Sequence, residues 1–328
     1  MRNAYIKSVG AFAPEKIVTN QFFNDILKED VDTWLVQNLT IKERRWCAEN
    51  ESTADLCVNA ANITLERANL KPEDLDLIII STDTPEFISP STASVVQYRL
   101  GAKNAGTFDL NSACAGFVTA LDVACKYIKS DDRYNNILVI GAYAMSKYLD
   151  LYDKKTVTLF ADGAGAVVVS ATEENKGFLA SELYTEGIYN SWMGIYAGGT
   201  KTPITKDVID NKDHLLKFVR KFPKEINPIT WTRMVNNLSD RTNIPVKDFN
   251  HYFMTQININ GIWETLDNLE VAHQKAHTIM DRFGYTGSAC IPMALNDAYE
   301  KGKLNNGDKL IFIGSGGGLA FASAAFIW

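Results

Sequence analysis

Residues 106–117 read GTFDLNSACAGF, and this stretch carries both a fold signal and a candidate nucleophile. The run GTFDL leads into a pattern that predicts a helix from Ala115 to Ser130, with Phe117 and Leu121 on its apolar face. Cys114 therefore falls at the point where a strand gives way to a helix. A run of this kind is typical of proteins in which strands and helices alternate.

The same junction occurs a second time in the chain. Cys290 follows GYTGSA and precedes another helical pattern, 176 residues after Cys114 (290 − 114 = 176). The apolar runs that begin at 76 and 251 are 175 residues apart, and those at 137 and 310 are 173 apart. Three matches at nearly one offset predict an internal duplication, although unrelated βαβ units also look alike.

Each half is predicted to contain strands separated by helices. In the first half the strands are DLIIIST, GTFDL, NNILVIGAY and GAGAVVVSA, and in the second they are HYFMTQ, HTIMDR, KLIFIGS and LAFASAAF. Helices are predicted at 91–100, at 115–130, from Ile259 onwards and at 291–301. This alternation predicts mostly parallel sheets covered by helices, in a layered α/β/α/β/α body.

The predicted division of the chain follows from the repeat. Residues 1–172 form an N-terminal half that carries the nucleophile, and residues 248–328 form a C-terminal half. The interval 173–247 is predicted to be a linker and an insertion that shapes a pocket, because its aromatic, Pro-containing sequence from 184 onwards breaks the repeat.

Composition and charge exclude several classes of function. The 328 residues carry a formal net charge of −6, which argues against a general nucleic-acid binder. One basic stretch, KFVRKFPK at 217–224, predicts a solvated helix face or, alternatively, a patch that contacts phosphate. No apolar run reaches the ~20 residues of a membrane span, and the first sixteen residues read as a strand rather than a signal peptide. These features predict a cytoplasmic protein.

The five cysteines are odd in number and widely spaced, which predicts free thiols, and no CxxC or HExxH motif indicates a metal site. Backbone N–H groups at a helix N-terminus favour a thiolate, so Cys114 is a candidate nucleophile; the alternative is a packed core cysteine. Cys290 is followed by Ile291 and Pro292, and we therefore favour Cys114. The terminal SGGG run, which includes Gly317, offers backbone N–H groups for an oxyanion or makes a tight chain reversal.

Four motifs of the chain resemble those of a known family. NSACAGF at 111–117, FADGAGA at 160–166, GYTGSA at 284–289 and SGGG at 315–318 are similar to the motifs of β-ketoacyl-ACP synthase III, a thiolase-like enzyme. The resemblance implies a thiolase-like α/β fold, a homodimer, and an acyl group delivered by an acyl-CoA or acyl-carrier-protein thioester. It implies no permanently bound cofactor. The family reaction is decarboxylative condensation of the acyl-enzyme with a malonyl thioester.

The sequence departs from this family at two catalytic positions. Thr255, in MTQIN at 254–258, stands where the family has a catalytic His, and Tyr285 stands at the catalytic Asn. Both hydroxyls can donate hydrogen bonds, but neither easily serves as a general base. We therefore expect acylation of Cys114 to be retained and decarboxylation to be impaired. His277 is the one histidine that we keep as a substitute candidate.

The resemblance also assigns a binding site for the donor. Trp34 matches the residue that stacks on the CoA adenine, Lys154 stands where an Arg is common, and Asn258 ends the MTQIN run. The alternatives are a buried Trp and a solvated Lys. Because the usual Arg cations are poorly kept, a carrier-protein donor becomes more plausible, and both CoA and a carrier protein stay open as donors.

Two hypotheses of different classes follow. In the first, the chain is an acyltransferase that loads Cys114, with Gly317 and the Cys114 amide as oxyanion donors, and passes the acyl group to an acceptor. Thr255 and Tyr285 orient that acceptor. The setting is fatty-acid-like or secondary-metabolite biosynthesis. In the second, the chain is a non-catalytic partner subunit of a heteromeric ketosynthase.

Overall fold

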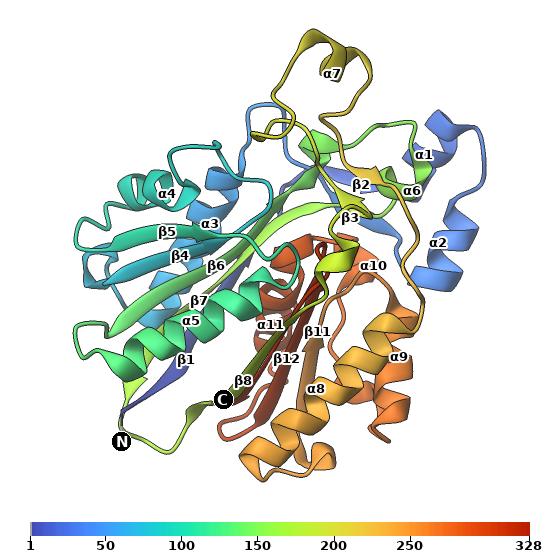
Figure 1. Cartoon of the computed structure of the whole chain (residues 1–328). Helices are drawn as coiled ribbons and strands as arrows, with labels where there is room; N and C mark the ends of the chain where they lie inside the picture. Colours follow the sequence, from blue (N-terminus) through green and yellow to red (C-terminus); the bar gives the residue numbers. More distant parts are fainter. Residues whose placement is uncertain (1) are drawn as a thin grey trace.

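The computed structural model describes residues 2–328, which form two large β-sheets and two two-stranded sheets, with helices between and around the large ones (Figure 1). The first sheet has the strand order β1-β7-β6-β4-β5, with β1 Asn3–Phe12, β4 Leu77–Ser81, β5 Gly106–Leu110, β6 Asn136–Ala144 and β7 Asp162–Thr172. The second has the order β11-β12-β13-β8, with β8 Gly177–Thr185, β11 His251–Met254, β12 Lys309–Gly316 and β13 Ala320–Ile327. The short strands are β2 Ile17–Thr19, β3 Glu43–Arg45, β9 Met193–Gly194 and β10 Lys217–Phe218.

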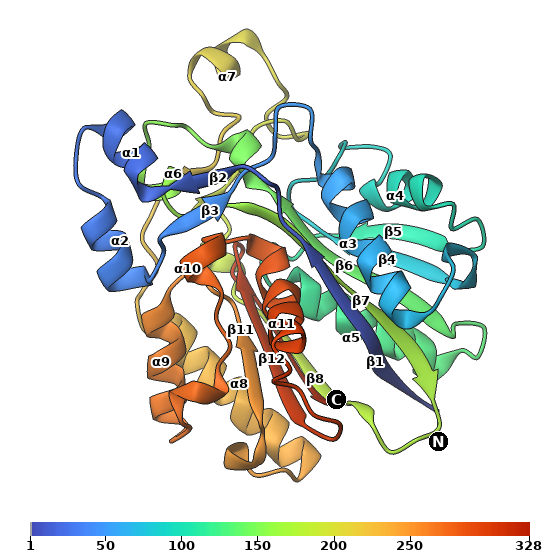
Figure 2. The same ribbon diagram turned by 180° about the vertical axis from the view of Figure 1, so that it is seen from behind.

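Helices separate the two sheets and cover their outer faces (Figures 1 and 2). Helices α5 Gly116–Ser130 and α11 Cys290–Glu300 lie between the sheets; α3 Thr53–Ala68 and α4 Thr92–Leu100 cover the first sheet, and α8 Ile226–Thr242 and α9 Ile259–Asn268 cover the second. The shorter helices are α1 Asn20–Leu27, α2 Asp32–Leu39, α6 Lys154–Val157, α7 Lys206–Asp210 and α10 Met280–Phe283. Single 3₁₀ turns occur at Pro72–Asp74, Met145–Tyr148, Gly187–Tyr189, Val246–Asp248, His273–Lys275 and Gly287–Ala289. The predicted layered α/β architecture is therefore confirmed.

The pairing of the strands repeats between the sheets. β1 pairs antiparallel with β7, β7 antiparallel with β6, and β6 parallel with β4. β8, β13, β12 and β11 follow the same sequence of pairings. This agreement supports the duplication indicated by the sequence offsets. The helices α5 and α11 occupy equivalent places, and each begins at or shortly after a cysteine: α11 at Cys290 and α5 two residues after Cys114.

The strand predicted at 277–282 (HTIMDR) is not formed, and that prediction was wrong. This segment is a loop that continues into α10, and its neighbour Ala276 makes only an isolated bridge to Tyr252. The Gln256 side chain donates to the His277 carbonyl (3.1 Å) and accepts from the Ile279 N–H (2.8 Å). These backbone groups are therefore engaged by a side chain instead of a neighbouring strand.

The interval 173–247 contributes to both the second sheet and a separate lobe. β8 is an edge strand of that sheet and α8 packs on its outer face, while the residues between them form the lobe with α7 at the top of Figure 1. Residues 217–224, predicted as a solvated helix face, form β10 and a loop, so the helix was wrong. The division of the chain at 172 and 247 stays a prediction.

The carboxyl ends of β4, β5 and β6 meet at one edge of the first sheet, because these three neighbours run parallel. The five cysteines are free and buried. Across residues 2–328, no helix combines the length and apolar character that a membrane span needs.

Candidate active site

Cys114 lies in the turn between β5 and α5, where the sequence predicted it. The turn is tight: Ala113 adopts a left-handed conformation (φ 45°), its N–H donates to the Asn111 Oδ1 (2.9 Å), and its carbonyl accepts from the Gly116 N–H (2.9 Å). A non-glycine residue in this conformation is strained, and such strain is common at functional sites. The turn presents Cys114 at the start of α5 with only 3% of its surface exposed.

The Cys114 thiol is protonated in the resting protein. Burial raises the pKa of this thiol well above its usual value, and the nearby negative charge of Asp83 raises the pKa further. A hydrogen bond from Tyr285 lowers the pKa but does not offset the burial. The helix N-terminus alone thus does not produce a resting thiolate, so attack by Cys114 requires a group that removes its proton.

The glycine run at 316–318 begins at the last residue of β12 and packs directly on the nucleophile turn. A Cβ added at Gly316 would overlap the Cys114 amide nitrogen and would lie 2.9 Å from both the Ala113 Cβ and the Ser112 carbonyl. A Cβ at Gly317 would meet only the Met193 carbonyl, at 3.4 Å. Glycine is thus required at 316 because two backbones approach each other there.

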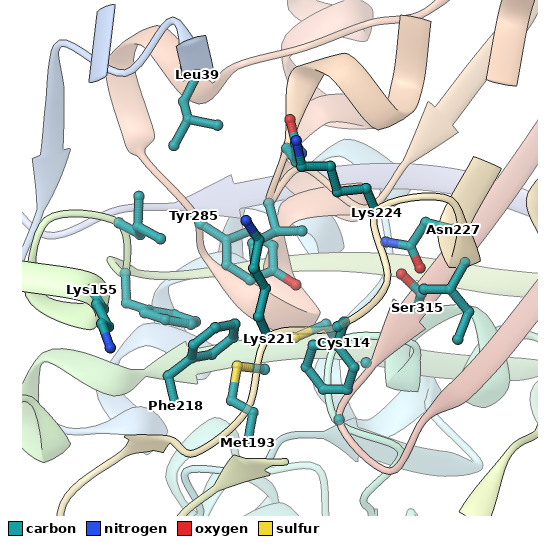
Figure 3. A pocket seen from close by; sticks show the side chains of 18 of the residues that line it. Leu39, Cys114, Lys155, Met193, Phe218, Lys221, Lys224, Asn227, Tyr285 and Ser315 are labelled. Atoms are coloured by element: carbon teal, nitrogen blue, oxygen red, sulfur yellow. The ribbon is translucent and has the colours of Figure 1, made fainter. Parts of the chain in front are cut away.

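A pocket of about 560 Å³ leads from the surface to Cys114 (Figure 3). Six of the seven predicted site residues line it: Cys114, Tyr285, Gly317, Trp34, Lys154 and Asn258. Lining residues that the prediction did not include come from the lobe and from α8, among them Met193, Phe218, Lys221, Lys224 and Asn227. Residues far apart in the sequence therefore converge on one cavity.

Tyr285 is held rigidly beside the nucleophile. Its backbone N–H donates to the Leu159 carbonyl (2.9 Å), its carbonyl accepts from the Ala161 N–H (2.9 Å), and its ring packs against Phe160 at 5.5 Å. Only 1% of Tyr285 is exposed, and burial raises its pKa well above the usual value. The hydroxyl is therefore a neutral hydrogen-bond donor at any physiological pH.

Thr255 is the one predicted site residue that does not line the pocket. It is 0% exposed, and its Oγ1 accepts from the Ser315 N–H at 2.9 Å. Its own N–H donates to the Ile313 carbonyl at 2.9 Å. Thr255 thus ties the end of β11 to β12, and its hydroxyl is engaged.

His277 also lies outside the pocket. Its Nε2 contacts Asp297 at 2.6 Å and its Nδ1 contacts Lys303 at 3.4 Å, which accounts for both ring nitrogens. Within residues 2–328, no histidine, aspartate or glutamate lines the pocket. The pocket itself therefore supplies no conventional general base.

The mouth of the pocket combines an aromatic face with ammonium groups. Trp34 is 56% exposed, which excludes the buried alternative. Lys154 pairs with Glu29 at 2.9 Å, and Lys155, Lys221 and Lys224 line the same mouth. An exposed indole beside several cations can bind a nucleotide or a phosphate. The basic stretch at 217–224 was the sequence signal for two of these lysines.

Asn258 has a structural contact of its own, because its side chain caps α9 by accepting from the Asn260 N–H at 3.0 Å. No group of three or more His, Cys, Asp or Glu side chains within residues 2–328 is arranged to hold a metal ion.

Comparison with known families gives two matches. Residues 108–187 match the family model of 3-oxoacyl-[acyl-carrier-protein (ACP)] synthase III, and residues 239–328 match the model of its C-terminal part. The first match includes the nucleophile turn, and the second includes β11, Tyr285 and the glycine run.

Individual relatives match over the whole chain. The β-ketoacyl-[acyl-carrier-protein] synthase III of Aliarcobacter butzleri is 36% identical over 325 residues, which is 98% of this chain and 97% of the relative. The crystal structure of the Aquifex aeolicus 3-oxoacyl-[acyl-carrier-protein] synthase III superposes with a TM-score of 0.89 at 32% identity, covering 99% of this chain and 100% of that one. The priming β-ketosynthase of the R1128 polyketide pathway superposes with a TM-score of 0.91 at 25% identity, covering 99% and 96%.

Proposed function

The chain belongs to the 3-oxoacyl-[acyl-carrier-protein] synthase III family, and we propose that it is an acyltransferase that carries the acyl group on Cys114. The observation that carries this proposal is the turn at the start of α5, which presents a cysteine at the inner end of a pocket with a basic mouth. A thioester substrate fits this arrangement, because its phosphates meet the lysines while its carbonyl reaches sulfur.

The proposed loading step is a thioester exchange. The Cys114 sulfur forms a bond to the acyl carbonyl carbon, and the bond from that carbon to the donor sulfur breaks. The backbone N–H groups of Cys114 and Gly317 hold the negative charge that develops on the carbonyl oxygen. The close packing of the glycine run on the nucleophile turn supports this pair of donors.

The donor is an acyl-CoA or an acyl-carrier-protein thioester, since both carry an acyl group on a phosphorylated pantetheine arm. We propose that Trp34, Lys154 and Asn258 contact this arm or its carrier. The acceptor is a carbon nucleophile or a hydroxyl, amine or thiol, and the setting is fatty-acid-like or secondary-metabolite biosynthesis. A homodimer and a cytoplasmic location stay predictions.

Intact-protein mass spectrometry tests the proposal. The purified protein is incubated with a panel of acyl-CoA and acyl-carrier-protein thioesters, and we expect a mass increase of one acyl group. Cys114→Ala removes the nucleophile and is expected to show no increase. If no donor acylates the wild-type protein, the acyltransferase is excluded and the partner-subunit hypothesis takes its place.

Tyr285→Phe tests the role of the hydroxyl beside the nucleophile. We expect transfer to the acceptor to fall by about 10²-fold, the effect of removing one oxyanion donor. Loading of Cys114 is expected to fall only about fivefold, because one hydrogen bond to the thiol is lost. Single-turnover loading and transfer rates are measured separately, with the exposed Tyr98→Phe as a matched control. Equal losses in both steps would remove Tyr285 from acceptor binding.

A further inference from the structure

The inner face of β4 leads directly to the nucleophile turn. Leu77 and Ile79 pack into the core around α5, whereas Ile78 and Ile80 pack into the outer core beneath α3 and α4. Ser81 continues the inner face, since a Cβ added at Gly116 of α5 would overlap its Oγ. The alternation of a strand thus places every second residue of this segment toward the start of α5.

Asp83 lies in the bend that directly follows the end of β4. Its neighbours Thr82 and Thr84 have their hydroxyls 3.2 Å apart, and the Thr84 N–H donates to the Thr82 Oγ1 at 3.0 Å. The Thr82 N–H donates to the Leu110 carbonyl at the end of β5, and the Thr84 Oγ1 accepts from the Ala144 N–H at the end of β6. The loop is therefore fixed between the two strand ends. The first of these strand ends, Leu110, leads directly into the nucleophile turn, so the loop that carries Asp83 lies beside that turn.

The Asp83 carboxylate has an unused acceptor. Its Oδ1 is shielded from solvent and has no hydrogen-bond partner within residues 2–328. Burial raises the pKa of Asp83 to about 6. The negative charge of Asp83 in turn raises the pKa of the Cys114 thiol. At neutral pH a carboxylate with one buried, unpaired oxygen thus lies near a protonated thiol.

We propose that Asp83 accepts the thiol proton of Cys114 when Cys114 attacks the donor thioester. This inference rests on the proposed function. The S–H bond breaks, and the proton passes to the Asp83 carboxylate directly or through one water. The new C–S bond forms on Cys114, and the C–S bond to the donor breaks. The departing thiolate takes the proton from Asp83, which restores the carboxylate with no change of oxidation state.

Among the titratable groups whose charges act on Cys114, Asp83 is the one with a pKa near neutral. Burial raises the pKa of Cys290 to about 12 and the pKa values of Tyr143 and Tyr285 well above their usual value, so these groups stay neutral. No lysine or arginine contributes to the pKa of Asp83. A carboxylate base is active above its pKa, so loading should weaken as the pH falls through about 6.

The test is the pH profile of Cys114 loading in single turnovers. Wild type should lose activity as the pH falls through about 6. Asp83→Asn should load about 10²-fold more slowly at pH 7.5, which is the lower end of the rate loss expected when a general base is removed. Its loading rate should also no longer fall as the pH is lowered through this range. Asp83→Glu should recover part of the rate. Glu86→Gln, whose carboxylate instead binds the Ala54 N–H (2.9 Å), is the matched control and should keep the wild-type profile.

The sign of the effect separates this role from a simple charge effect. If Asp83 were only a negative neighbour, Asp83→Asn would lower the pKa of Cys114 and loading would become faster. Faster or unchanged loading would therefore overturn the proposal. Alkylation of Cys114 by iodoacetamide provides an arm that needs no acyl donor, and Asp83→Asn should slow it at pH 7.5. If no donor loads the wild type, the proposed function fails, and the alkylation rates still decide the role of Asp83.

Discussion

A Gly316→Ala substitution is expected to slow acylation of Cys114 by about 10³-fold and to destabilise the fold by about 2 kcal/mol. The added Cβ overlaps the Cys114 amide nitrogen, and its other close contacts are the Ser112 carbonyl and the Ala113 Cβ at 2.9 Å. No long side chain is available to swing away. Relief requires a shift of the whole nucleophile turn, which moves the amide that we assign to the oxyanion.

Single-turnover acylation followed by intact mass and a thermal melt of the same samples measure the two effects. Gly187→Ala is the matched control, because nothing lies within 4 Å of its added Cβ. The control is expected to keep the wild-type rate and melting temperature. If Gly316→Ala loads at the wild-type rate, the nucleophile turn can shift without loss of activity. Close packing of the glycine run would then not be what positions the nucleophile.

The local part of this site could be predicted from the sequence. A strand that passes into a helix through small residues predicts the place of Cys114, and the spacing of Phe117 and Leu121 predicts the buried face of α5. These features depend on residues near one another in the chain. The repeated offsets indicate the duplication for the same reason, since each unit is built from local patterns.

The remaining features depend on contacts between distant segments. Thr255 follows a strand in a promising motif, but its hydroxyl turns to the Ser315 N–H and away from the pocket. Lys221 and Lys224 reach the mouth only because the lobe folds back over α6 and the glycine run. Asp83 belongs to no motif, and its place depends on the ends of β5 and β6, which hold its loop beside the nucleophile turn. Sequence spacing alone carries none of this information.

The second large effect concerns the reaction with a malonyl thioester. We expect the wild-type acyl-enzyme to release CO₂ from malonyl-acyl-carrier-protein at least about 10³-fold more slowly than a family member with the usual catalytic His and Asn. The resemblance assigns Thr255 and Tyr285 to those positions. The Thr255 hydroxyl is engaged by Ser315, whereas the Tyr285 hydroxyl forms a hydrogen bond with Cys114 and lies beside the reacting sulfur.

Release of labelled CO₂ measures this step, with a family member that has the usual His and Asn as the reference in the same assay and with loading of Cys114 followed in parallel. Losing a single donor to the developing enolate costs about 10²–10³-fold, and no imidazole among residues 2–328 lines the pocket to compensate. Slow CO₂ release with normal loading would direct the acyl group to an acceptor that needs no decarboxylation. Release at the rate of loading would instead mean that Tyr285 alone stabilises the enolate, and condensation with a malonyl thioester would become the reaction of this chain.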